Sequence, residues 1–321
     1  MPTALITGVS GQDGSYLSEF LVAKDYHVVG LTRNARRALG SGYARAFAGI
    51  ELVEGSFEST PSLFQDLIKR EKPDEVYHLG GPTRVSTSWQ KPVETQIDIA
   101  LSTAMLVTAA VEELPSPRVF FAGSSEIFAA EDHPQNEGSP RDPPSPYGKA
   151  KLEAMEFVER ARRDYGLYGV TGILYNHESP RRGADFVSQK IVKAAVRIAR
   201  GSKESLQLGA IDVRRDWGFA GDYVRAMWLM MFQDDPEDLV IGSGVDHSVA
   251  DMCDAAFACV GLNWKDHVES DPSLLRPSDP PFRVADPSRA KSRLGWTPEV
   301  DFERLIAMMV EHEKGQLSAD G

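Results

Sequence analysis

The feature that most constrains this chain is a glycine-rich turn near its N-terminus, between a short apolar run and a helical pattern. The apolar run covers residues 4–7, and apolar side chains recur at helical spacing from Ser15 onward. Glycines let the backbone turn tightly beside a phosphate group, and the N-terminus of a helix offers unpaired N–H groups to an anion. A strand, such a turn and a helix therefore predict a dinucleotide site of the Rossmann type. The residues expected to bind the cofactor there are Gly8, Gly11, Gln12, Asp13 and Gly14.

Strands and helices continue to alternate after this turn. Further strands are expected at residues 26–31, 50–53, 75–79, 118–122 and 169–174, and helices at 61–69, 97–114 and 146–165. This alternation predicts an α/β fold, a Rossmann-type doubly wound parallel sheet. We place the dinucleotide-binding domain at residues 1–175. The remaining segments are shorter and richer in Pro, Arg and Asp, with one helix expected at 286–296. Residues 176–321 are therefore expected to form a smaller C-terminal substrate-binding lobe, interleaved with the last sheet strands.

The composition excludes several classes of function. Hydrophobic residues make up 42% and charged residues 26% of the 321, as in ordinary globular proteins. A net charge of −12 argues against a nucleic-acid surface, and no apolar run is long enough for a membrane span. The N-terminus lacks a basic, apolar leader, so a cytoplasmic location is expected. Cys253 and Cys259 are expected to be buried as small hydrophobes, without a disulfide or a metal.

The segment after the second expected strand bears on the choice of cofactor. It reads GLTRN at residues 30–34 and contains no carboxylate. NAD sites usually have Asp or Glu there for the ribose 2′-hydroxyl, whereas an arginine can bind a 2′-phosphate. We therefore expect NADP, with Arg33 as the contact, and keep NAD as the alternative. In that alternative Arg33, Arg36 and Arg37 only form a solvated loop.

A tyrosine and a lysine lie four residues apart at the start of the helix expected at 146–165. Ser145 is a suitable N-cap and Pro146 suits the first helical position. Tyr147 and Lys151 then share one helical face. A lysine cation near a phenol lowers its pKa, so Tyr147 is expected to act as a base near neutral pH. The pair is unremarkable on its own and gains meaning from the dinucleotide turn before it.

Polar residues follow the strand expected at 118–122, where the sequence reads GSSE. The carboxyl ends of strands are the ligand-binding edge of such a sheet. Ser124 is expected to hydrogen-bond the substrate hydroxyl that Tyr147 deprotonates. Glu126 is expected to move a carbon-bound proton; the alternative is that it merely caps the following turn.

Several separated stretches resemble the extended short-chain dehydrogenase/reductase superfamily, and more narrowly the GDP-mannose 4,6-dehydratase family. They read GQDGSYL at 11–17, NHESPRRG at 176–183, RRDWG at 214–218 with DY at 222–223, RP at 276–277 and LGW at 294–296. The resemblance covers nearly the whole chain.

The resemblance implies a mechanism on a nucleotide sugar. Tyr147 would remove the proton of the sugar 4-hydroxyl while hydride passes from C4 to the nicotinamide. Glu126 would then take the C5 proton and assist departure of the 6-hydroxyl as water, before hydride returns to C6. The product would be a 4-keto-6-deoxy sugar. Ser124 matches the family's hydroxyl residue, usually threonine, and Lys151 would orient the nicotinamide ribose.

The resemblance also implies the binding residues and the assembly. Leu79 would contact the cofactor together with Tyr147 and Lys151. The substrate-binding residues would be Thr83, Asn176, Lys190, Arg215 and Arg276. No metal is expected, because His177 and Glu178 lack a second pair at ligand spacing. The partner is then a small nucleotide sugar, and a homodimer or homotetramer is expected through the helices near 97–114 and 146–165.

Four segments depart from the family pattern. Residues 78–85 read HLGGPTRV where the family has Asn-Leu-Ala/Gly-Ala-Gln-Ser, which puts Pro82 and Arg84 near the cofactor and the sugar. Gly55-Ser56 replaces a Gly-Asp pair that addresses the adenine. The 2′-phosphate loop is altered at 34–41, and Ala210 and residues 279–281 also differ. These changes bear on the substrate more than on the redox residues.

Three alternatives to a GDP-mannose 4,6-dehydratase stay open. The first is the same chemistry on another nucleotide sugar, such as a GDP-heptose. The second is an epimerase or 4-reductase of the superfamily, which would not need Glu126. The third is a binding protein without catalysis, against which Ser124, Tyr147 and Lys151 together argue.

Overall fold

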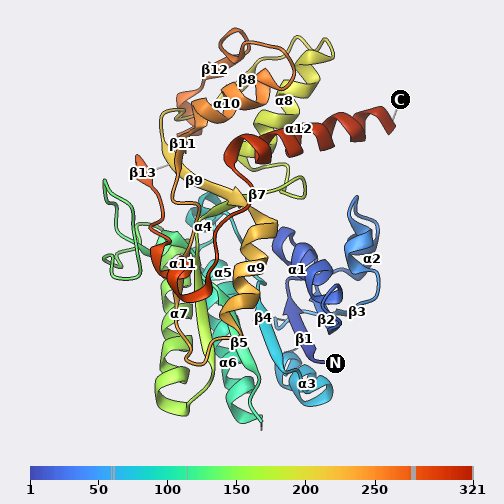
Figure 1. The fold of residues 1–321 in the computed structure, drawn as a ribbon, viewed down its shortest axis with the longest axis vertical. Helices are drawn as coiled ribbons and strands as arrows, with labels where there is room; N and C mark the ends of the chain where they lie inside the picture. Colours follow the sequence, from blue (N-terminus) through green and yellow to red (C-terminus); the bar gives the residue numbers. More distant parts are fainter. Residues whose placement is uncertain (59, 61, 114, 276–279, 320–321) are drawn as a thin grey trace.

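The structure, a computed structural model, describes residues 1–58, 60, 62–113, 115–275 and 280–319. Its centre, in the lower part of Figure 1, is a sheet of parallel strands. The strand order is β10-β6-β5-β4-β1-β2-β3. The strands are β1 (Thr3–Thr7), β2 (His27–Thr32), β3 (Glu51–Glu54), β4 (Glu75–His78), β5 (Arg118–Ala122), β6 (Gly169–Leu174) and β10 (Leu239–Ile241). The strand order reverses between β1 and β4, so their carboxyl ends form the crevice where such sheets bind ligands.

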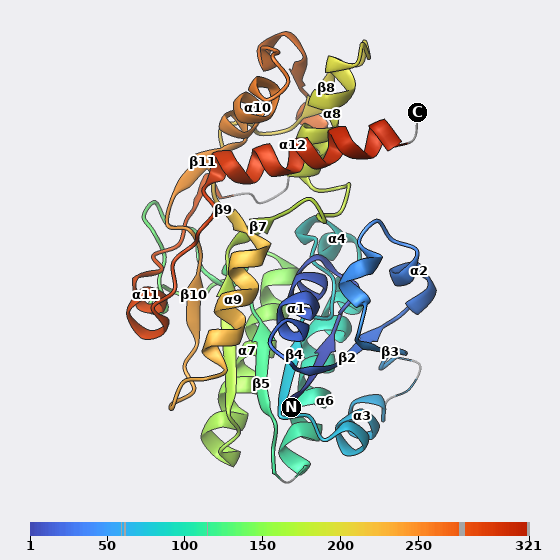
Figure 2. The same cartoon turned by 45° about the vertical axis from the view of Figure 1, so that its right-hand side comes forward.

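Helices cover both faces of this sheet and enclose two apolar clusters. They are α1 (Gln12–Val22) and α9 (Ala220–Met230) on one face, and α3 (Leu63–Glu71), α6 (Ser102–Glu112) and α7 (Pro146–Tyr165) on the other. Figure 2 shows α1 and α9 in front of the strands. Successive side chains of a strand point to opposite faces. Ile6 therefore packs with Leu17 of α1, whereas Leu5 packs with Val76 in the other cluster.

A smaller lobe lies beyond the carboxyl ends of the large sheet, at the top of Figure 1. Its strands are β7 (Asn176–Glu178), β9 (Arg214–Phe219), β11 (Asp246–Ser248) and β13 (Phe282–Arg283), with β8 (Leu206–Leu208) paired to β12 (Val268–Ser270). Helices α8 (Val187–Ala199), α10 (Val249–Ala258) and α12 (Phe302–Ala319) enclose a third apolar cluster, which contains Ile191, Met252 and Leu305. Between these segments the chain returns to the large sheet with α9 and β10.

The parallel, doubly wound sheet confirms the expected fold class. Strands β5 and β6 and helix α7 have the predicted bounds. Helix α7 begins where Ser145 Oγ accepts a hydrogen bond from the Gly148 N–H at 3.1 Å. It ends at Gly166, whose φ of 70° is a left-handed conformation that favours glycine. Strong local signals at both ends explain why this helix was predictable.

Other elements differ from the expectation. Helix α1 begins at Gln12 rather than Ser15. The helix expected at 97–114 begins with a π-helical segment (Ile97–Leu101) before α6, and its last expected residue lies outside the described residues. Two short helices, α4 (Val85–Gln90) and α5 (Pro92–Gln96), precede it. The helix expected at 286–296 is shorter, α11 (Ser288–Leu294), because the Asp286 carboxylate accepts the Ser288 N–H at 3.1 Å and the left-handed Gly295 ends it.

The two cysteines differ in their surroundings. Cys253 is buried in α10, as expected. Cys259 is exposed, so the expected burial is wrong for it; it is the C-cap of α10 and lies off the helical face that buries Cys253, Ala256 and Phe257. Neither forms a disulfide. None of the helices in the described ranges combines the length and the apolar character needed to cross a membrane.

Candidate active site

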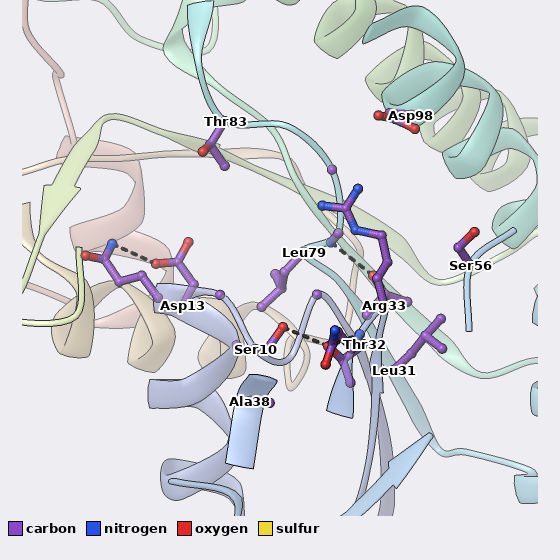
Figure 3. Close-up of a pocket in the computed structure, with 18 of the residues that line it drawn as sticks. Ser10, Asp13, Leu31, Thr32, Arg33, Ala38, Ser56, Leu79, Thr83 and Asp98 are labelled. Carbon is purple, nitrogen blue, oxygen red and sulfur yellow. Dashed lines mark hydrogen bonds between the residues drawn. The ribbon is translucent and has the colours of Figure 1, made fainter. Parts of the chain in front are cut away.

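A cavity of about 490 Å³ opens at the carboxyl ends of β1, β2 and β4. Figure 3 shows Asp13 and Thr83 on one side of it and Arg33 and Ser56 on the other. The predicted residues that line it are Gly8, Gly11, Gln12, Asp13, Gly14, Arg33, Leu79 and Thr83. Tyr147 and Lys151 are not part of this lining. The structure thus brings one group of predicted residues together and places the Tyr–Lys pair beside them on α7.

The glycine-rich turn leaves no room for side chains. A Cβ on Gly8 would lie 2.8 Å from the Gly80 Cα, and φ at Gly8 is +71°. A Cβ on Gly14 would lie 2.5 Å from the Gly8 carbonyl oxygen. Gly11, the N-cap of α1, brings no side chain to the first turn. The backbone N–H groups at this helix start therefore face the cavity uncovered, which fits the pyrophosphate of a dinucleotide.

A second corner of the cavity follows β2 and the short helix α2 (Ala35–Leu39). Arg33 and Arg37 line it, together with Ser41 and Tyr43. Arg36, the third arginine of this segment, is not in the lining. Two guanidinium groups and two hydroxyls are the donor set that suits a phosphate monoester.

Three predicted catalytic residues meet where β5 ends and α7 begins. Ser124, Tyr147 and Lys151 are all buried. Ser124 hydrogen-bonds the Tyr147 phenol. Lys151 Nζ donates to the carbonyl oxygen of Ala122 at 2.7 Å and lies 5.8 Å from the centre of the Tyr147 ring. The hydroxyl of Ser124, the phenol of Tyr147 and the amine of Lys151 thus lie together between the end of β5 and the start of α7.

The pKa values of this group depart from the expectation for the tyrosine. Burial raises the pKa of Tyr147 to about 12, although the hydrogen bond from Ser124 opposes this rise. The expected lowering of the Tyr147 pKa by Lys151 is therefore wrong for this structure, because the ammonium is directed to the Ala122 carbonyl rather than to the phenol oxygen. Burial lowers the pKa of Lys151 to about 8. Tyr147 is thus protonated at neutral pH in this state.

Glu126 lies in η3 (Ser125–Ile127), the turn that follows β5. The cap of this turn is Ser124, whose Oγ accepts the Glu126 N–H at 3.3 Å. The Glu126 side chain is 20% exposed and lies 3.8 Å from Nε of Arg283. The carboxylate is therefore not needed as the cap, which removes the support for that alternative.

Gly148 is a residue of this site that the sequence reading missed. A Cβ on Gly148 would lie 2.3 Å from the Glu126 carbonyl oxygen and 2.9 Å from the Pro143 Cβ. The first turn of α7 therefore packs directly on η3 and fixes Glu126 relative to Tyr147. The signal available was the glycine directly after Tyr147, a weak helix former inside a predicted helix.

The predicted substrate residues come from the smaller lobe and from the loop after β4. Thr83 lines the cavity. Asn176 lies in β7, Lys190 is exposed on α8, and Arg215 is buried in β9. Arg276, the fifth predicted residue, lies outside the described residues.

The predicted phosphate loop contacts residues 176–183, the second of the stretches that resemble the family. His177 Nε2 lies 2.9 Å from the Asp13 carboxylate, and its ring stacks on Tyr223 with centroids 4.4 Å apart. Gln12 Nε2 donates to the His177 carbonyl oxygen at 3.1 Å, and Ser179 Oγ donates to Gln12 Oε1 at 2.8 Å. Burial alone would lower the pKa of His177 and raise that of Asp13. The interaction between the two groups outweighs burial, so the pKa of His177 is raised and that of Asp13 is lowered. These contacts connect the predicted phosphate loop to the smaller lobe.

His78, at the end of β4, is a further cavity residue that sequence reading did not single out. Its Nδ1 lies 2.7 Å from Thr7 Oγ1, and its Nε2 lies 3.5 Å from Ser102 Oγ. Burial lowers the pKa of His78 to about 3, with the Lys151 charge adding to the effect. A neutral imidazole therefore joins β1, β4 and α6 below the cavity.

Within the described ranges, His27, Glu51 and Glu71 are close enough together to hold a metal ion. His27 and Glu51 begin β2 and β3, and Glu71 ends α3, at the opposite edge of the sheet from the cavity. Arg70 forms ion pairs with both carboxylates, at 3.5 Å from Glu51. The acidic charges are thus compensated by a guanidinium, and this group supports no metal chemistry in the cavity.

Comparison with known sequences gives matches along almost the whole chain. A sequence model of the family described as GDP-mannose 4,6 dehydratase matches residues 5–309. GDP-mannose 4,6 dehydratase 1 of Arabidopsis thaliana is 43% identical over 324 residues, which cover 97% of this chain and 89% of the relative. GDP-mannose 4,6 dehydratase of Homo sapiens is 38% identical over 336 residues, covering 96% and 90%.

Solved structures share the fold at lower identity. UDP-glucose 4-epimerase of Thermotoga maritima with UDP-glucose has a TM-score of 0.87 at 23% identity, covering 98% of this chain and 99% of that one. dTDP-glucose 4,6-dehydratase of Bacillus anthracis in complex with NAD has a TM-score of 0.85 at 16% identity, covering 99% and 98%. These similarities confirm the Rossmann-type α/β fold.

Proposed function

Because the chain belongs to the GDP-mannose 4,6-dehydratase family, as its motifs predicted, we propose that it converts GDP-mannose into a GDP-4-keto-6-deoxy sugar. The observation that carries this proposal is the packing of α7 on η3 through Gly148. It holds the Glu126 carboxylate close enough to Tyr147 for its charge to act on the phenol. Oxidation at C4 needs the phenol alone, whereas loss of water across C5 and C6 needs a second proton carrier.

The residues divide the reaction between them. The nicotinamide, when bound, supplies the acceptor and later the donor of one hydride. Tyr147, in its phenolate form, takes the proton of the 4-hydroxyl beside Ser124. Burial raises the pKa of this phenol in this structure, so the proposal requires that the bound cofactor and substrate lower that pKa. The C4 ketone acidifies the C5–H bond, whose proton passes to Glu126 as the C5–C6 double bond forms. The 6-hydroxyl leaves with a proton from the same carboxyl group, so that one water is lost. Addition of the stored hydride at C6 and of the proton held by Tyr147 at C5 would then give the 4-keto-6-deoxy sugar, with no net oxidation.

We propose NADP as the cofactor and keep NAD as the alternative. The cradle around Gly8 and Gly14, which any Cβ would fill, fits a pyrophosphate. Arg33 and Arg37 supply the charge for a 2′-phosphate at the end of β2. Lys151 would orient the nicotinamide ribose from the side of Tyr147.

The nucleotide sugar would lie between the cavity and the smaller lobe. We assign it to Thr83, Asn176, Lys190, Arg215 and Arg276. This assignment keeps a dinucleotide-binding domain at residues 1–175 and a substrate-binding lobe at 176–321, with α9 and β10 returning to the large sheet.

We propose that the chain forms a homodimer, with a homotetramer as the alternative. Four exposed apolar side chains recur at every fourth residue before and within the start of the long helix: Trp89, Val93, Ile97 and Leu101, with exposures of 42, 70, 36 and 49%. The segment that bears them packs against α7. An exposed stripe of this kind marks a protein interface.

A related sugar, such as a GDP-heptose, is the second candidate substrate. The observation behind it is Arg84, which forms an ion pair with Asp185 and lies 5.9 Å from the Phe186 ring centre. This contact joins the loop after β4 to the smaller lobe beside the cavity residue Thr83. An epimerase or 4-reductase is less well supported, because neither uses a carboxylate at the position of Glu126.

The test is turnover of GDP-mannose by the purified protein with catalytic NADP. We expect a product lighter by one water. A product of unchanged mass would indicate an epimerase, and turnover of a GDP-heptose alone would indicate the second substrate. The Glu126→Gln variant should lose no water from the sugar while oxidation at C4 remains detectable. Retention of both steps would contradict the role of Glu126.

A further inference from the structure

Arg283 is a buried guanidinium that the reaction described above does not use. It ends β13, which pairs with β9 so that Arg283 lies opposite Arg215. Its side chain is 3% exposed. The two residues that follow Arg283 are fixed by hydrogen bonds to different segments. The Val284 carbonyl oxygen accepts the Gln135 N–H at 2.9 Å, and the Ala285 N–H donates to the Asp216 carboxylate at 3.2 Å. The backbone that carries Arg283 therefore has little freedom.

The guanidinium is aimed at the turn that bears Glu126. Nη1 of Arg283 donates a hydrogen bond to the Ser125 carbonyl oxygen, and Nε lies 3.8 Å from Glu126 Oε1. Among the residues that the structure describes, neither Nε nor Nη2 has a hydrogen-bond partner. A buried cation with unused donors is costly unless an anion completes it. The Glu126 carboxylate lies beside it, slightly beyond hydrogen-bond distance.

We infer that Arg283 is a positioning residue for the loss of water, which holds the turn at Ser125 and orients the Glu126 carboxylate toward the C5 proton. This inference rests on the proposed function. Nη1 of the guanidinium fixes the backbone of the turn, while Nε attracts the carboxylate. Arg283 touches neither C4 nor Tyr147 in this role, so it acts on the second half of the reaction.

The same strand links Arg283 to the nucleotide end. Arg215, its neighbour across the β9–β13 pair, is the residue assigned above to the nucleotide. The two arginines therefore have different roles. Arg215 contributes to binding of the nucleotide, whereas Arg283 contributes to proton transfer at C5.

The test compares Arg283→Met with Arg283→Lys and with a matched control, Arg289→Met. Arg289 is a partly exposed arginine of α11 that pairs with Glu237, away from the cavity. The readouts are kcat and KM for GDP-mannose, the isotope effect of a C5-deuterated substrate, and thermal unfolding. We expect Arg283→Met to lower kcat about 100-fold, the scale of one positioned proton carrier, with KM within about threefold. Removal of the C5 proton then limits the rate, so the C5 isotope effect rises above that of the wild type.

The variants separate the possible failures. Arg283→Lys should recover part of kcat, because an ammonium keeps the charge and one donor, and Arg289→Met should match the wild type. A rise in KM without a larger C5 isotope effect would make Arg283 a nucleotide-binding residue and overturn the inference. Unchanged kcat, or an equal loss in all three variants, would overturn it too. If the wild type itself incorporates no deuterium at C5 in D₂O, the proposed function fails before Arg283 is tested.

Discussion

Replacement of Gly148 by alanine tests whether the contact between α7 and η3 sets the active-site geometry. The added Cβ would lie 2.3 Å from the Glu126 carbonyl oxygen, whereas ordinary contacts are about 3.5 Å. The helix or the turn must therefore move by about 1 Å. A misplacement of that size can cost about 100-fold in rate, or about 2.7 kcal/mol of transition-state stabilisation.

The effect on stability should be smaller than the effect on rate. Overpacking costs about 1–3 kcal/mol, but alanine regains about 1 kcal/mol of helix propensity over glycine. We therefore expect a net loss of about 0–2 kcal/mol in the free energy of unfolding. The rate loss would thus appear in a protein that is still folded.

The assay is kcat from water loss, measured beside thermal unfolding of the same Gly148→Ala preparation. Gly315→Ala is the matched control, because no atom lies within 4 Å of the added Cβ and φ is not left-handed there. The control should keep full activity and gain up to about 1 kcal/mol of stability. Full activity of the Gly148→Ala variant would refute the reasoning, since it would show that η3 can move to accommodate the added Cβ without a loss of Glu126 function.

Three further predictions concern the cofactor, the lobe contact and the interface. Arg33→Ala should raise KM for NADP about tenfold or more and leave KM for NAD unchanged, because a charged hydrogen bond is worth about 1.5–3 kcal/mol; equal changes for both cofactors would contradict the 2′-phosphate role. The ion pair of Asp13 and His177 stabilises the fold fully between pH 3.8 and 6.5, since the pKa of Asp13 is lowered and that of His177 is raised, and is lost on either side. The Tm deficit of His177→Gln should therefore be largest within this window and shrink as the pH rises; a deficit independent of pH would rule out the charge effect. Val93→Glu should shift the sedimentation coefficient to that of a monomer with unchanged circular dichroism, and a variant that still sediments as the wild type does would exclude this face.

The parts of the fold that were predictable are those with short-range causes. Gly11 and Gly14 are constrained by atoms of Gly8 and Val9 within the same turn, although Gly8 itself also packs on Gly80 of the loop after β4. Helix α7 has its cap, its proline and its terminal glycine within its own segment. The start of α11 was misjudged because the Asp286 carboxylate accepts the Ser288 N–H, so that the helix begins two residues later than expected.

The parts that were not predictable depend on contacts distant in sequence. Arg283 reaches Ser125 across 158 positions, and no local pattern marks that pairing. The raised pKa of Tyr147 has the same origin, because burial by the completed fold outweighs the lysine four residues away. Cys259 was misplaced because positions six apart do not share one face of a helix, so the face of α10 that buries Cys253 does not include Cys259.

The return of α9 and β10 to the large sheet has a consequence for synthesis on the ribosome. When residue 175 has emerged, β6 is complete, yet its outer edge has no partner until Leu239–Ile241 follows. The apolar face that α9 covers stays open for nearly as long. A nascent chain of that length exposes an unpaired strand edge beside an apolar surface, and this combination promotes aggregation. A fragment cut at 175 would share this defect, so the nucleotide-binding half depends on the later half to finish folding.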